Sequence, residues 1–384
     1  MSDDTTGVTR RNVLKTTGVA VGVGGLGGLA TAKGNDNLVE VNLGYSERSG
    51  RRAAENAASS VVRRFNFDAM TIEVDENAVK GLRKRGDVRY VEANGQMHAF
   101  AQSTPYGIDR VDADVAHDSG ETGAGADVAI LDTGIDSDHP DLQANLGEGK
   151  AFVSAKGPYD ESWDDDNDHG THCAGTADAV DNDEGVVGVS TEATLHAVKV
   201  LDKRGSGSFS DIAAGIEYTA DQGWDVASMS LGASSGSQTI KDACTYAYDR
   251  GVFLVAAAGN DGPCSDCVGY PAAYSEVVAV SATDSNDDLA SFSSTGSEVE
   301  IAAPGVDVES TVPGGGYDVF SGTSMACPHV AGAGAQLMAN GYTNTEARDR
   351  LASTAEDIGL ASNEQGAGLL DTAAALGLDS SDDL

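Results

Sequence analysis

The stretch from residue 320 to residue 332 constrains this chain more than any other, because it surrounds one hydroxyl with small residues and then continues as good helix formers. Its sequence is Phe-Ser-Gly-Thr-Ser-Met-Ala-Cys-Pro-His-Val-Ala-Gly, with Ser324 at its fifth position. We expect a tight loop that enters a helix near Ser324. Backbone N–H groups are unpaired at the start of a helix, and the helix dipole favours negative charge there. The pattern therefore predicts an exposed serine oxygen beside a place that stabilises negative charge.

A serine hydroxyl is a weak nucleophile unless a base, and an acid that orients the base, lie beside it. The chain carries candidates for both, each in a motif of small residues. A short apolar run ends at Asp132, and a His-Gly-Thr-His motif puts His169 in the first turn of a second expected helix. Another apolar run ends shortly before Asn260. Because α/β sheets gather their sites at the ends of strands, we expect these side chains and Ser324 to meet.

The spacing of the apolar runs predicts an α/β fold. Helical stretches separate most of the runs, which is the pattern of a mainly parallel central sheet covered on both faces. The runs lie at residues 128–131, 195–201, 226–230, 252–258 and 277–280.

In type and chain order, Asp132, His169, Asn260 and Ser324 resemble the catalytic residues of the subtilisin-like serine proteases, the subtilases or peptidase family S8. The resemblance covers roughly residues 35–378 and implies a subtilisin-like three-layer fold. It also implies peptide-bond hydrolysis: His169 would take the proton of Ser324, and Asp132 would hold the imidazole. Asn260 and the Ser324 N–H would stabilise the oxyanion.

Two other histidines compete for the role of base. His172 follows His169 by three residues, but the motif match favours the first histidine. His329 is expected to be a packed or capping histidine.

By the same resemblance, an extended peptide substrate would lie between two strand edges, where main-chain pairing tolerates many sequences. Gly269 would form the base of the primary specificity pocket and leave room for a large apolar or aromatic residue before the cut. Phe209, Ile212 and Leu231 would line a second apolar pocket, with ordinary core packing as the alternative. The two edges are Gly205, Ser206 and Gly207, and Ser230, Leu231 and Gly232.

Calcium is the cofactor that the resemblance implies. The loop over residues 179–186 has the length of the tight calcium site of the family, and six oxygens suit Ca²⁺. Gln102 would join this site only after the chain is cleaved before Ala101, which would couple maturation to stability. The expected ligands are Gln102, Asp141, Asn182 and the carbonyls of Val180, Glu184 and Val186.

Two units precede the expected catalytic unit, residues 101–384. Residues 1–32 contain twin arginines, a glycine-rich apolar stretch and an Ala-Thr-Ala cleavage site. They predict a twin-arginine signal peptide rather than a membrane anchor, because the stretch is too short and polar to span a bilayer. Residues 33–100 show a β-α-β-α-β pattern, with a helix expected over residues 51–65.

Residues 33–100 resemble the subtilase propeptide, a small ferredoxin-like α+β unit that acts as chaperone and temporary inhibitor in that family. Self-cleavage is expected after Phe100. A permanent small domain is the alternative.

Acidic residues are concentrated in residues 101–384, which hold 49 aspartates and glutamates against 10 lysines and arginines. The resulting net charge of −39 excludes nucleic-acid binding. The acidic side chains would repel one another strongly in dilute buffer. Roughly 1 M salt would screen this repulsion, because it shortens the Debye length to about 3 Å. We therefore expect a protein that needs high salt, as in the halolysin-like subtilases of haloarchaea. The alternative is acidity that merely keeps a secreted protein soluble.

An acidic run, residues 164–168, directly precedes His169. One interpretation is halophilic surface. The other is a site that favours basic groups next to the cleaved residue and raises the His169 pKa.

Five cysteines remain to be assigned. Cys264 and Cys267 favour a local disulfide, with half a zinc site as the alternative. Cys173, Cys244 and Cys327 are expected to be buried thiols.

Together these patterns predict a secreted, extracellular, monomeric serine endopeptidase of broad specificity that acts on proteins and peptides and is inhibited transiently by its own propeptide. No membrane anchor is expected. The chain ends about six residues past the expected catalytic domain, so no C-terminal extension is expected either. The alternatives are a selective processing protease and an inactive subtilase-fold binding protein.

Overall fold

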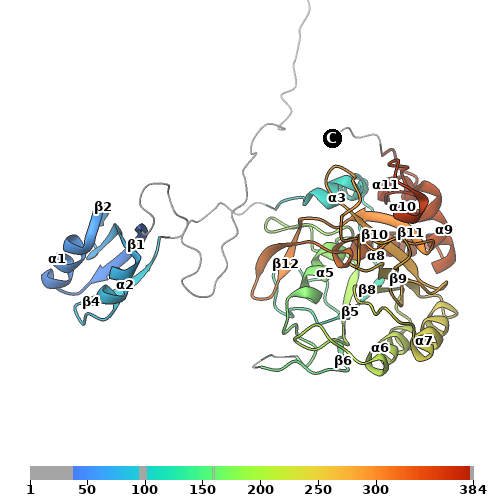
Figure 1. Ribbon diagram of the computed structural model, residues 1–384, viewed down its shortest axis with the longest axis horizontal. Coiled ribbons are helices and arrows are strands. Elements are labelled where there is room, and N and C mark those ends of the chain that lie inside the picture. Colours follow the sequence, from blue (N-terminus) through green and yellow to red (C-terminus); the bar gives the residue numbers. More distant parts are fainter. Residues whose placement is uncertain (1–37, 95–101, 158, 160, 381–384) are drawn as a thin grey trace, which may run out of the picture. The chain divides into compact units, whose positions relative to one another are not determined.

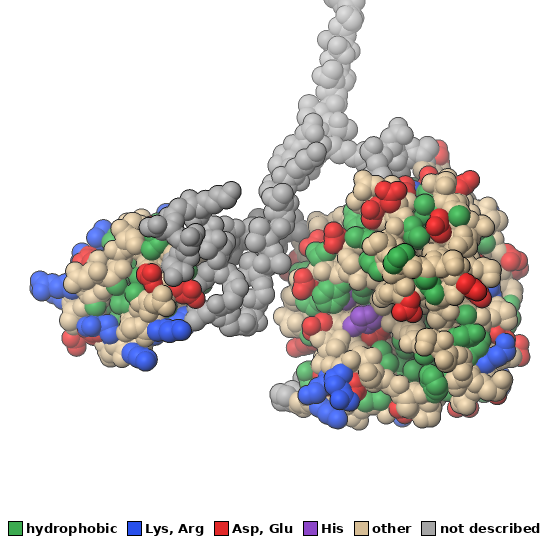
Figure 2. Space-filling model, in the orientation of Figure 1, with side chains coloured by type: hydrophobic (Ala, Val, Ile, Leu, Met, Phe, Trp, Pro, Cys, Tyr) green, Lys and Arg blue, Asp and Glu red, His purple; other side chains and the backbone are tan. Residues whose placement is uncertain are grey.

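The computed structural model describes residues 38–94, 102–157, 159 and 161–380. The expected signal peptide and the expected cleavage point after Phe100 lie outside these residues. The chain divides into two compact units, Met1–Ala99 and Phe100–Leu384 (Figure 1). Acidic side chains are scattered over the visible face of the second unit (Figure 2).

The first unit is a four-stranded antiparallel sheet with two helices, in the strand order β2-β3-β1-β4. Alternate residues of β1 and β3, such as Val41 and Ile72, fill its core. The chain order β-α-β-β-α-β is that of ferredoxin-like units. Its elements are β1 (Leu38–Tyr45), α1 (Arg48–Ala57), β2 (Ala58–Phe65), β3 (Ala69–Asp75), α2 (Glu76–Arg83) and β4 (Val88–Ala93).

The helix expected over residues 51–65 is wrong in its second half. The helix α1 ends at Ala57, and the following eight residues form β2, which pairs with β3 along its length. β2 carries two adjacent valines, Val61 and Val62, whose branched side chains favour strands. The edge of β3 supplies hydrogen-bond partners that helical spacing does not reveal.

The second unit has a seven-stranded sheet in the order β11-β10-β9-β8-β5-β7-β6, and every strand pair in it is parallel. A separate hairpin joins β12 and β13. The elements are α3 (Tyr106–Arg110), α4 (Ala113–Asp118), β5 (Asp127–Asp132), β6 (Lys150–Ala151), α5 (His169–Asp178), β7 (Thr194–Lys199), α6 (Phe209–Gln222), β8 (Val226–Met229), α7 (Gln238–Tyr248), β9 (Phe253–Ala257), β10 (Val278–Thr283), β11 (Val299–Pro304), β12 (Val308–Val312), β13 (Gly316–Phe320), α8 (Thr323–Ala339), α9 (Asn344–Thr354), α10 (Ser362–Gln365) and α11 (Thr372–Leu376).

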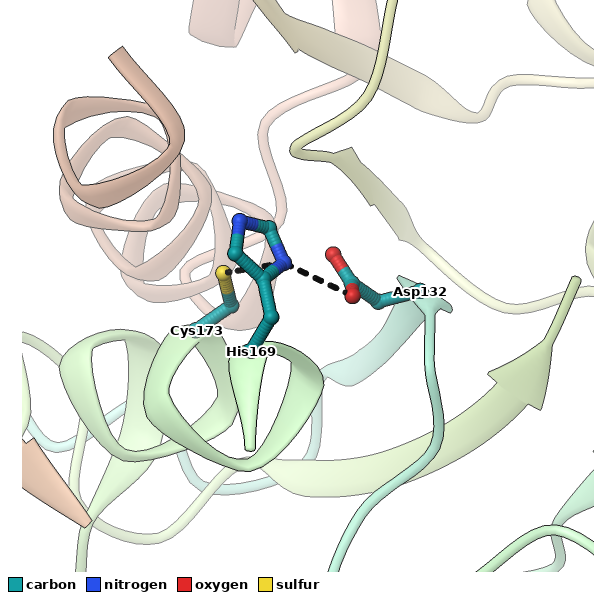
Figure 3. Close-up of side chains that lie close together, drawn as sticks. All are labelled: Asp132, His169 and Cys173. Atoms are coloured by element: carbon teal, nitrogen blue, oxygen red, sulfur yellow. Dashed lines mark hydrogen bonds and ion pairs between the residues drawn. The ribbon is translucent and has the colours of Figure 1, made fainter. Parts of the chain in front are cut away.

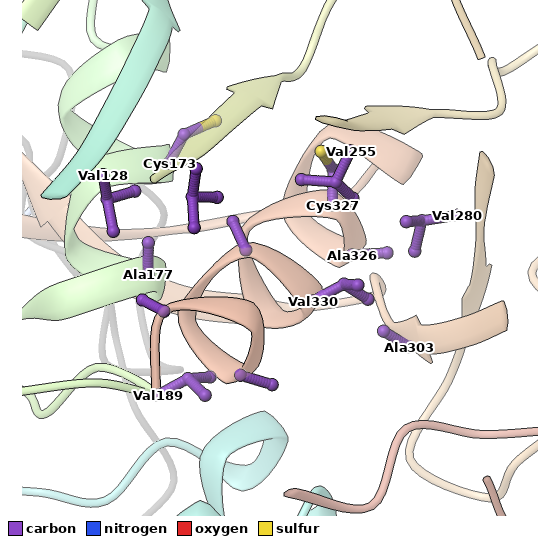
Figure 4. Packing of buried hydrophobic residues seen from close by; sticks show 14 of the residues in the cluster. Val128, Cys173, Ala177, Val189, Val255, Val280, Ala303, Ala326, Cys327 and Val330 are labelled. Carbon is purple, nitrogen blue, oxygen red and sulfur yellow. The ribbon is translucent and has the colours of Figure 1, made fainter. Parts of the chain in front are cut away.

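Alternating side chains of the strands fill two cores, one on each face of this sheet. Val128 and Ile130 of β5 lie in the core that α5 and α8 cover, whereas Ala129 and Leu131 lie in the core that α6 and α7 cover. Figure 4 shows the first core, where small and branched side chains pack around α8. The unit is therefore built in three layers, as the apolar runs predict.

The topology brings the candidate residues to one edge of the sheet. After β5 the chain forms the edge strand β6, then β7 between β6 and β5, and then crosses to β8 on the other side of β5. Open α/β sheets place their sites outside the carboxyl ends of strands at such a switch point. Asp132 is the last residue of β5, and His169 and Ser324 stand at the starts of α5 and α8.

Candidate active site

Asp132 and His169 form the best-defined contact of the site. His169 Nδ1 lies 2.8 Å from Asp132 Oδ1 (Figure 3). Asp132 is fully buried, and the same oxygen accepts a 2.7 Å hydrogen bond from the backbone N–H of Thr133. Burial of the imidazole opposes its charged form, but the charge and hydrogen bond of Asp132 outweigh that effect and hold the His169 pKa well above its usual value. A carboxylate so placed fixes the imidazole tautomer, because it leaves Nε2 as the acceptor.

Buried hydrogen bonds hold β5 and α5 together. Thr133 Oγ1 donates to Asp165 Oδ1 at 2.8 Å and accepts from the N–H of Gly170 at 2.9 Å. A Cβ atom at Gly170 would collide with the carbonyl oxygen of Gly134, so only glycine permits this close approach. The position of the imidazole relative to Asp132 is thus set by the protein interior.

Ser324 is the second residue of α8, in the tight turn that the sequence predicts. Its hydroxyl donates to the Ser230 carbonyl at 3.4 Å, and the structure shows no hydrogen bond between this hydroxyl and His169 among the described residues. The Cys173 thiol lies 4.0 Å from His169 Nδ1 and 3.4 Å from the Ser324 carbonyl, so it contacts both residues. Bonds between a nucleophile and its base are often long before substrate binds.

Thr323 orients the side chain of Asn260. The Asn260 Oδ1 atom accepts hydrogen bonds from Thr323 N and Thr323 Oγ1, both at 2.9 Å. Because these bonds occupy the oxygen end of the amide, its NH₂ group is left to face the loop before Ser324. Gly322 lies close by on that side, since a Cβ there would be 3.5 Å from Asn260 Nδ2.

The other two histidines considered as catalytic or capping groups are buried in the protein interior. His172 Nε2 donates to the Val308 carbonyl at 3.0 Å and its ring stacks on Phe320. His329 Nδ1 donates to the Met325 carbonyl at 2.8 Å. Burial lowers the pKa of each to about 4, so both imidazoles are neutral packing groups at neutral pH.

Two cavities adjoin these residues. One, of about 410 Å³, is lined by Ser324, Asn260 and Gly269. The other, of about 440 Å³, is lined by His169, both residue groups expected as strand edges and a set of apolar side chains. Ser230, Leu231 and Gly232 line both cavities. All nine residues expected to bind substrate therefore line one cavity or the other.

Comparison with known proteins places the chain in a family. The sequence profile of the subtilase family matches residues 123–368. The chain belongs to the subtilase family. It is 48% identical over 305 residues to subtilisin amylosacchariticus from Bacillus subtilis subsp. amylosacchariticus, covering 78% of each chain. It is 46% identical over 308 residues to an alkaline protease from Alkalihalobacillus alcalophilus (80% of this chain, 78% of the relative), and 47% identical over 280 residues to a subtilisin from Bacillus pumilus (72% and 99%).

Most of the expected calcium ligands of this subtilase lie in one place, and Gln102 is already there in the uncut chain, so the expectation that it joins the site only after cleavage is wrong. Gln102 Nε2 donates to the carbonyls of Val180 and Val186 at 2.7 and 3.1 Å. Asp141 Oδ1 accepts from Asn182 Nδ2 at 3.0 Å, and its Oδ2 accepts from Val186 N at 2.9 Å. Two carbonyls and one carboxylate thus face the amide groups of Gln102 and Asn182.

Further hydrogen bonds in this loop also involve amide oxygens and backbone N–H groups. Glu184 N donates to Asn182 Oδ1 at 2.7 Å, and Asn182 N donates to Gln102 Oε1 at 3.1 Å. The candidate donor atoms are carboxylate, amide and carbonyl oxygens, which are the ligands that a hard cation such as Ca²⁺ takes. The residues present therefore fit the ion.

The acidic run before His169 is mostly internal, which corrects both interpretations for three of its four carboxylates. Asp164 and Asp165 are buried, and Asp165 accepts hydrogen bonds from both the backbone N–H and the hydroxyl of Thr171. Asp166 is also almost fully enclosed and pairs with buried Lys199 at 2.6 Å. These three carboxylates lie inside the subtilase and are neither halophilic surface nor a substrate contact, whereas Asp168, the last residue of the run, is exposed. The pKa of His169 is raised by Asp132 instead.

The cysteines are divided between a bridge and buried thiols. Cys264 and Cys267 are joined by a disulfide. Cys173, Cys244 and Cys327 are free and buried. Burial raises the pKa of the Cys244 and Cys327 thiols to about 12, so neither is a reactive thiolate at neutral pH.

Three further residues at the site escape sequence reasoning. Thr323 holds the Asn260 amide, Asn167 accepts a 3.2 Å hydrogen bond from the N–H of His169, and Arg204 lines the larger cavity. Thr323 and Arg204 directly precede the predicted residues Ser324 and Gly205, and Asn167 lies within the acidic run, so sequence proximity was the one signal available.

Among the described residues, no helix is both long and apolar enough to cross a membrane.

Proposed function

We propose that this subtilase is a secreted serine endopeptidase that cuts proteins with broad specificity in high salt and matures by cutting its own chain. The observation that carries the proposal is the pair of buried Asp132 and partly exposed His169 beside Ser324 and Asn260, at the junction of two cavities. The names of the relatives, subtilisins and alkaline proteases, support the same activity.

In the proposed mechanism, Ser324 attacks the carbonyl carbon of a peptide bond. His169 Nε2 takes the hydroxyl proton and later returns it to the leaving amine. Asp132 keeps Nδ1 protonated and stabilises the imidazolium that forms in between. Water then attacks the acyl-enzyme in the reverse sense, which releases the second product and restores Ser324.

The oxyanion of each tetrahedral intermediate would be held by two donors. One is the Asn260 NH₂ group, which the Thr323 bonds turn towards the loop before Ser324. The other is the backbone N–H of Ser324 at the start of α8, where the helix dipole adds to the effect.

Specificity before the cut would come from the smaller cavity. Gly269 lines it without a side chain, and Ser230–Gly232, the extended segment directly after β8, borders it. A large apolar or aromatic residue fits such a space, and the main-chain edges accept many sequences on either side. Three of the four carboxylates of the acidic run are internal, which weakens the one sequence feature that favoured a selective processing protease. The intact set of four candidate residues speaks against an inactive binding protein.

Intact mass tests the proposal directly. Wild type and Ser324→Ala are expressed and held in high salt, and each chain is weighed. We expect wild type to begin at Ala101 and the variant to remain uncut at that junction, because the variant lacks the nucleophile. Trimming of both chains would show that another protease performs the cut. An untrimmed wild type that also fails to hydrolyse casein would refute the proposed activity.

Calcium is proposed as a structural ion of the 179–186 loop. The oxygens of Gln102, Asp141 and Asn182 and the carbonyls of Val180, Glu184 and Val186 would hold it, as their convergence supports. When bound, the ion would neutralise Asp141 and tie the start of the catalytic unit to this loop. Ser324 lies outside the set, so the ion takes no part in the chemistry.

Removing calcium should lower the melting temperature of Ser324→Ala by several degrees, because binding to the folded state alone stabilises it by mass action. The measurement is thermal unfolding with EGTA and with about 1 mM CaCl₂. Asp141→Asn should lose most of this difference, whereas Asp242→Asn, at an exposed helical position, should keep it. A calcium effect of equal size in all three proteins would contradict the assignment.

A further inference from the structure

The larger cavity contains two kinds of lining that call for different substrate side chains. Its apolar lining comes from α6, α7 and the segment around Tyr274, and includes Phe209, Ile212 and Ile240. Its polar lining includes Asn167, His169 and Arg204. Arg204 is the one charged side chain besides the histidine among the residues that line this cavity.

Hydrogen bonds place Arg204 beside the reactive centre. The His169 N–H donates to Asn167 Oδ1 at 3.2 Å, and Asn167 Nδ2 donates to the Lys203 carbonyl at 3.1 Å. A single side chain therefore connects the start of α5 to the residue before Arg204. The loop that carries the arginine is anchored to the candidate base itself.

The same loop is rigid on its other side. Asp202 Oδ1 accepts from the N–H groups of Arg204 and Ser206 at 2.9 and 3.2 Å, and Asp202 N donates to the Ser206 carbonyl at 2.9 Å. Gly205 closes the turn at φ +69°, a conformation that favours glycine. The backbone of Arg204 is thus held in place before substrate arrives.

The guanidinium group remains available to a ligand. It contacts Asp202 through Nε and Nη2 at 3.3 and 3.0 Å, and its side chain is 79% exposed. Exposed pairs of this kind are weak, and Nη1 has no hydrogen-bond partner in the described parts of the chain. Lys203, the residue before Arg204, makes no ion pair with a described residue. With Lys203 and Arg204 against Asp202, the loop carries a net positive charge.

This positive loop is unusual on its unit, where 49 acidic residues face 10 basic ones. Figure 2 shows a group of basic side chains on the visible face of this unit, below a histidine, on a face where acidic side chains are widely scattered. The carboxylates of the run before His169 are not among the residues that line the cavity. A substrate carboxylate in the cavity would meet the Arg204 guanidinium, and no Asp or Glu is among the residues that line the cavity.

Resting on the proposed function, we propose that Arg204 selects substrates with Asp or Glu at the second residue before the cut. Side chains of an extended peptide alternate between faces, so the second and fourth residues before the cut point the same way, about 7 Å apart. A single cavity with a charged part near His169 and an apolar part beyond it fits that pair. The first residue before the cut points instead to the cavity at Gly269.

The test uses peptides that differ only at this second position, which is Glu, Gln or Lys. For the matured wild type we expect kcat/KM to be about two- to fivefold higher for Glu than for Gln, and lower for Lys than for Gln, at the lowest salt in which the protein stays folded. The preference should shrink as salt rises, because screening weakens the pair. Arg204→Gln should equalise Glu and Gln, and Arg204→Glu should favour Lys.

Arg250→Gln is the matched control, since it removes one positive charge from α7's end, outside the residues that line the cavity. It should keep the wild-type preference. Equal rates for Glu and Gln in wild type, or the same preference in Arg204→Gln, would overturn the proposal.

Binding separates this inference from the proposed chemistry. Ser324→Ala is titrated with the three peptides by fluorescence anisotropy. If wild type cleaves none of them but Ser324→Ala still binds the Glu peptide more tightly than the Gln peptide, the proposed function fails and the acidic subsite stands. If all are cleaved and bound equally, the function stands and the subsite is refuted.

Discussion

At the scale of single residues, the orientation of Asn260 decides whether the site can hold an oxyanion. An amide has a donor end and an acceptor end, and only the donor end stabilises negative charge. Two bonds from Thr323 hold the acceptor end and leave the donor end available. Thr323 is therefore a positioning residue that acts through Asn260.

Removing these groups should lower turnover in a graded way. Asn260→Ala should reduce kcat by roughly 10²–10³ with little change in KM, the size of loss known for such a donor in a subtilisin. Thr323→Val should reduce kcat by a smaller factor, about tenfold, because one of the two bonds to Asn260 Oδ1 remains. Steady-state kinetics on a chromogenic peptide measures both. Thr323→Ser should restore the rate; if it does not, the hydroxyl is not what orients the amide.

The raised pKa of His169 predicts the pH at which activity is lost on the acid side of the pH profile, its acid limb. The base must be neutral to accept a proton, so kcat/KM should fall as pH drops through a pKa that lies above the usual 6.5. Asp132→Asn removes the charge that raises this pKa and should move the limb to lower pH, with a rate loss of about 10⁴. A pH profile of kcat/KM for both proteins checks this. An unmoved limb would mean that another group controls it.

At the scale of elements, the connection between β5 and α5 depends on a buried ion pair. The side chains of Lys199 on β7 and Asp166 before α5 are 0% and 3% exposed and 2.6 Å apart. Lys199 also donates to the Thr133 carbonyl, next to Asp132. The pair therefore ties together the two segments that carry the candidate acid and base.

Breaking this pair should destabilise the fold more than removing it whole. Lys199→Met should lower the free energy of unfolding by about 3–5 kcal/mol, because it leaves the Asp166 carboxylate buried and unpaired. Asp166→Asn combined with Lys199→Met should recover much of the loss. Urea unfolding in the Ser324→Ala background measures both, with exposed Lys203→Met as a control expected to stay within about 0.5 kcal/mol. Additive losses in the double variant would contradict the pairing.

At the scale of the whole molecule, charge repulsion opposes folding of the catalytic unit. Its net charge of −39 is compensated by few basic partners. At roughly 1 M salt the Debye length is about 3 Å, so repulsion between charges that lie farther apart is largely screened. The melting temperature of Ser324→Ala should therefore rise steadily as KCl is raised from about 0.1 M to about 3 M.

Neutralising surface acids should replace part of that salt effect. Glu217, Glu309 and Asp349 are exposed. Their joint change to Gln, Gln and Asn should raise the melting temperature at low salt and flatten its dependence on KCl. An unchanged slope would show that salt acts through water structure or specific ions rather than by screening.

The sequence by itself was enough to predict Asp132, His169, Asn260 and Ser324 as the central residues of the candidate site and the class of fold around them. Local patterns suffice for this, because the Gly-Thr-Ser turn, the His-Gly-Thr-His motif and the apolar runs each specify their own strand end or helix start. The cores follow for the same reason, since alternate residues such as Val128 and Ala129 segregate to opposite faces of the sheet.

Only the tertiary structure decided the fate of the charges and of one strand. Asp165 and Asp166 are buried because Thr133 and Lys199, both distant in sequence, satisfy their oxygens. β2 is a strand because β3 offers its edge. Whether a polar group is buried or exposed, and whether a segment pairs, depends on partners that folding brings together, and no local pattern encodes them.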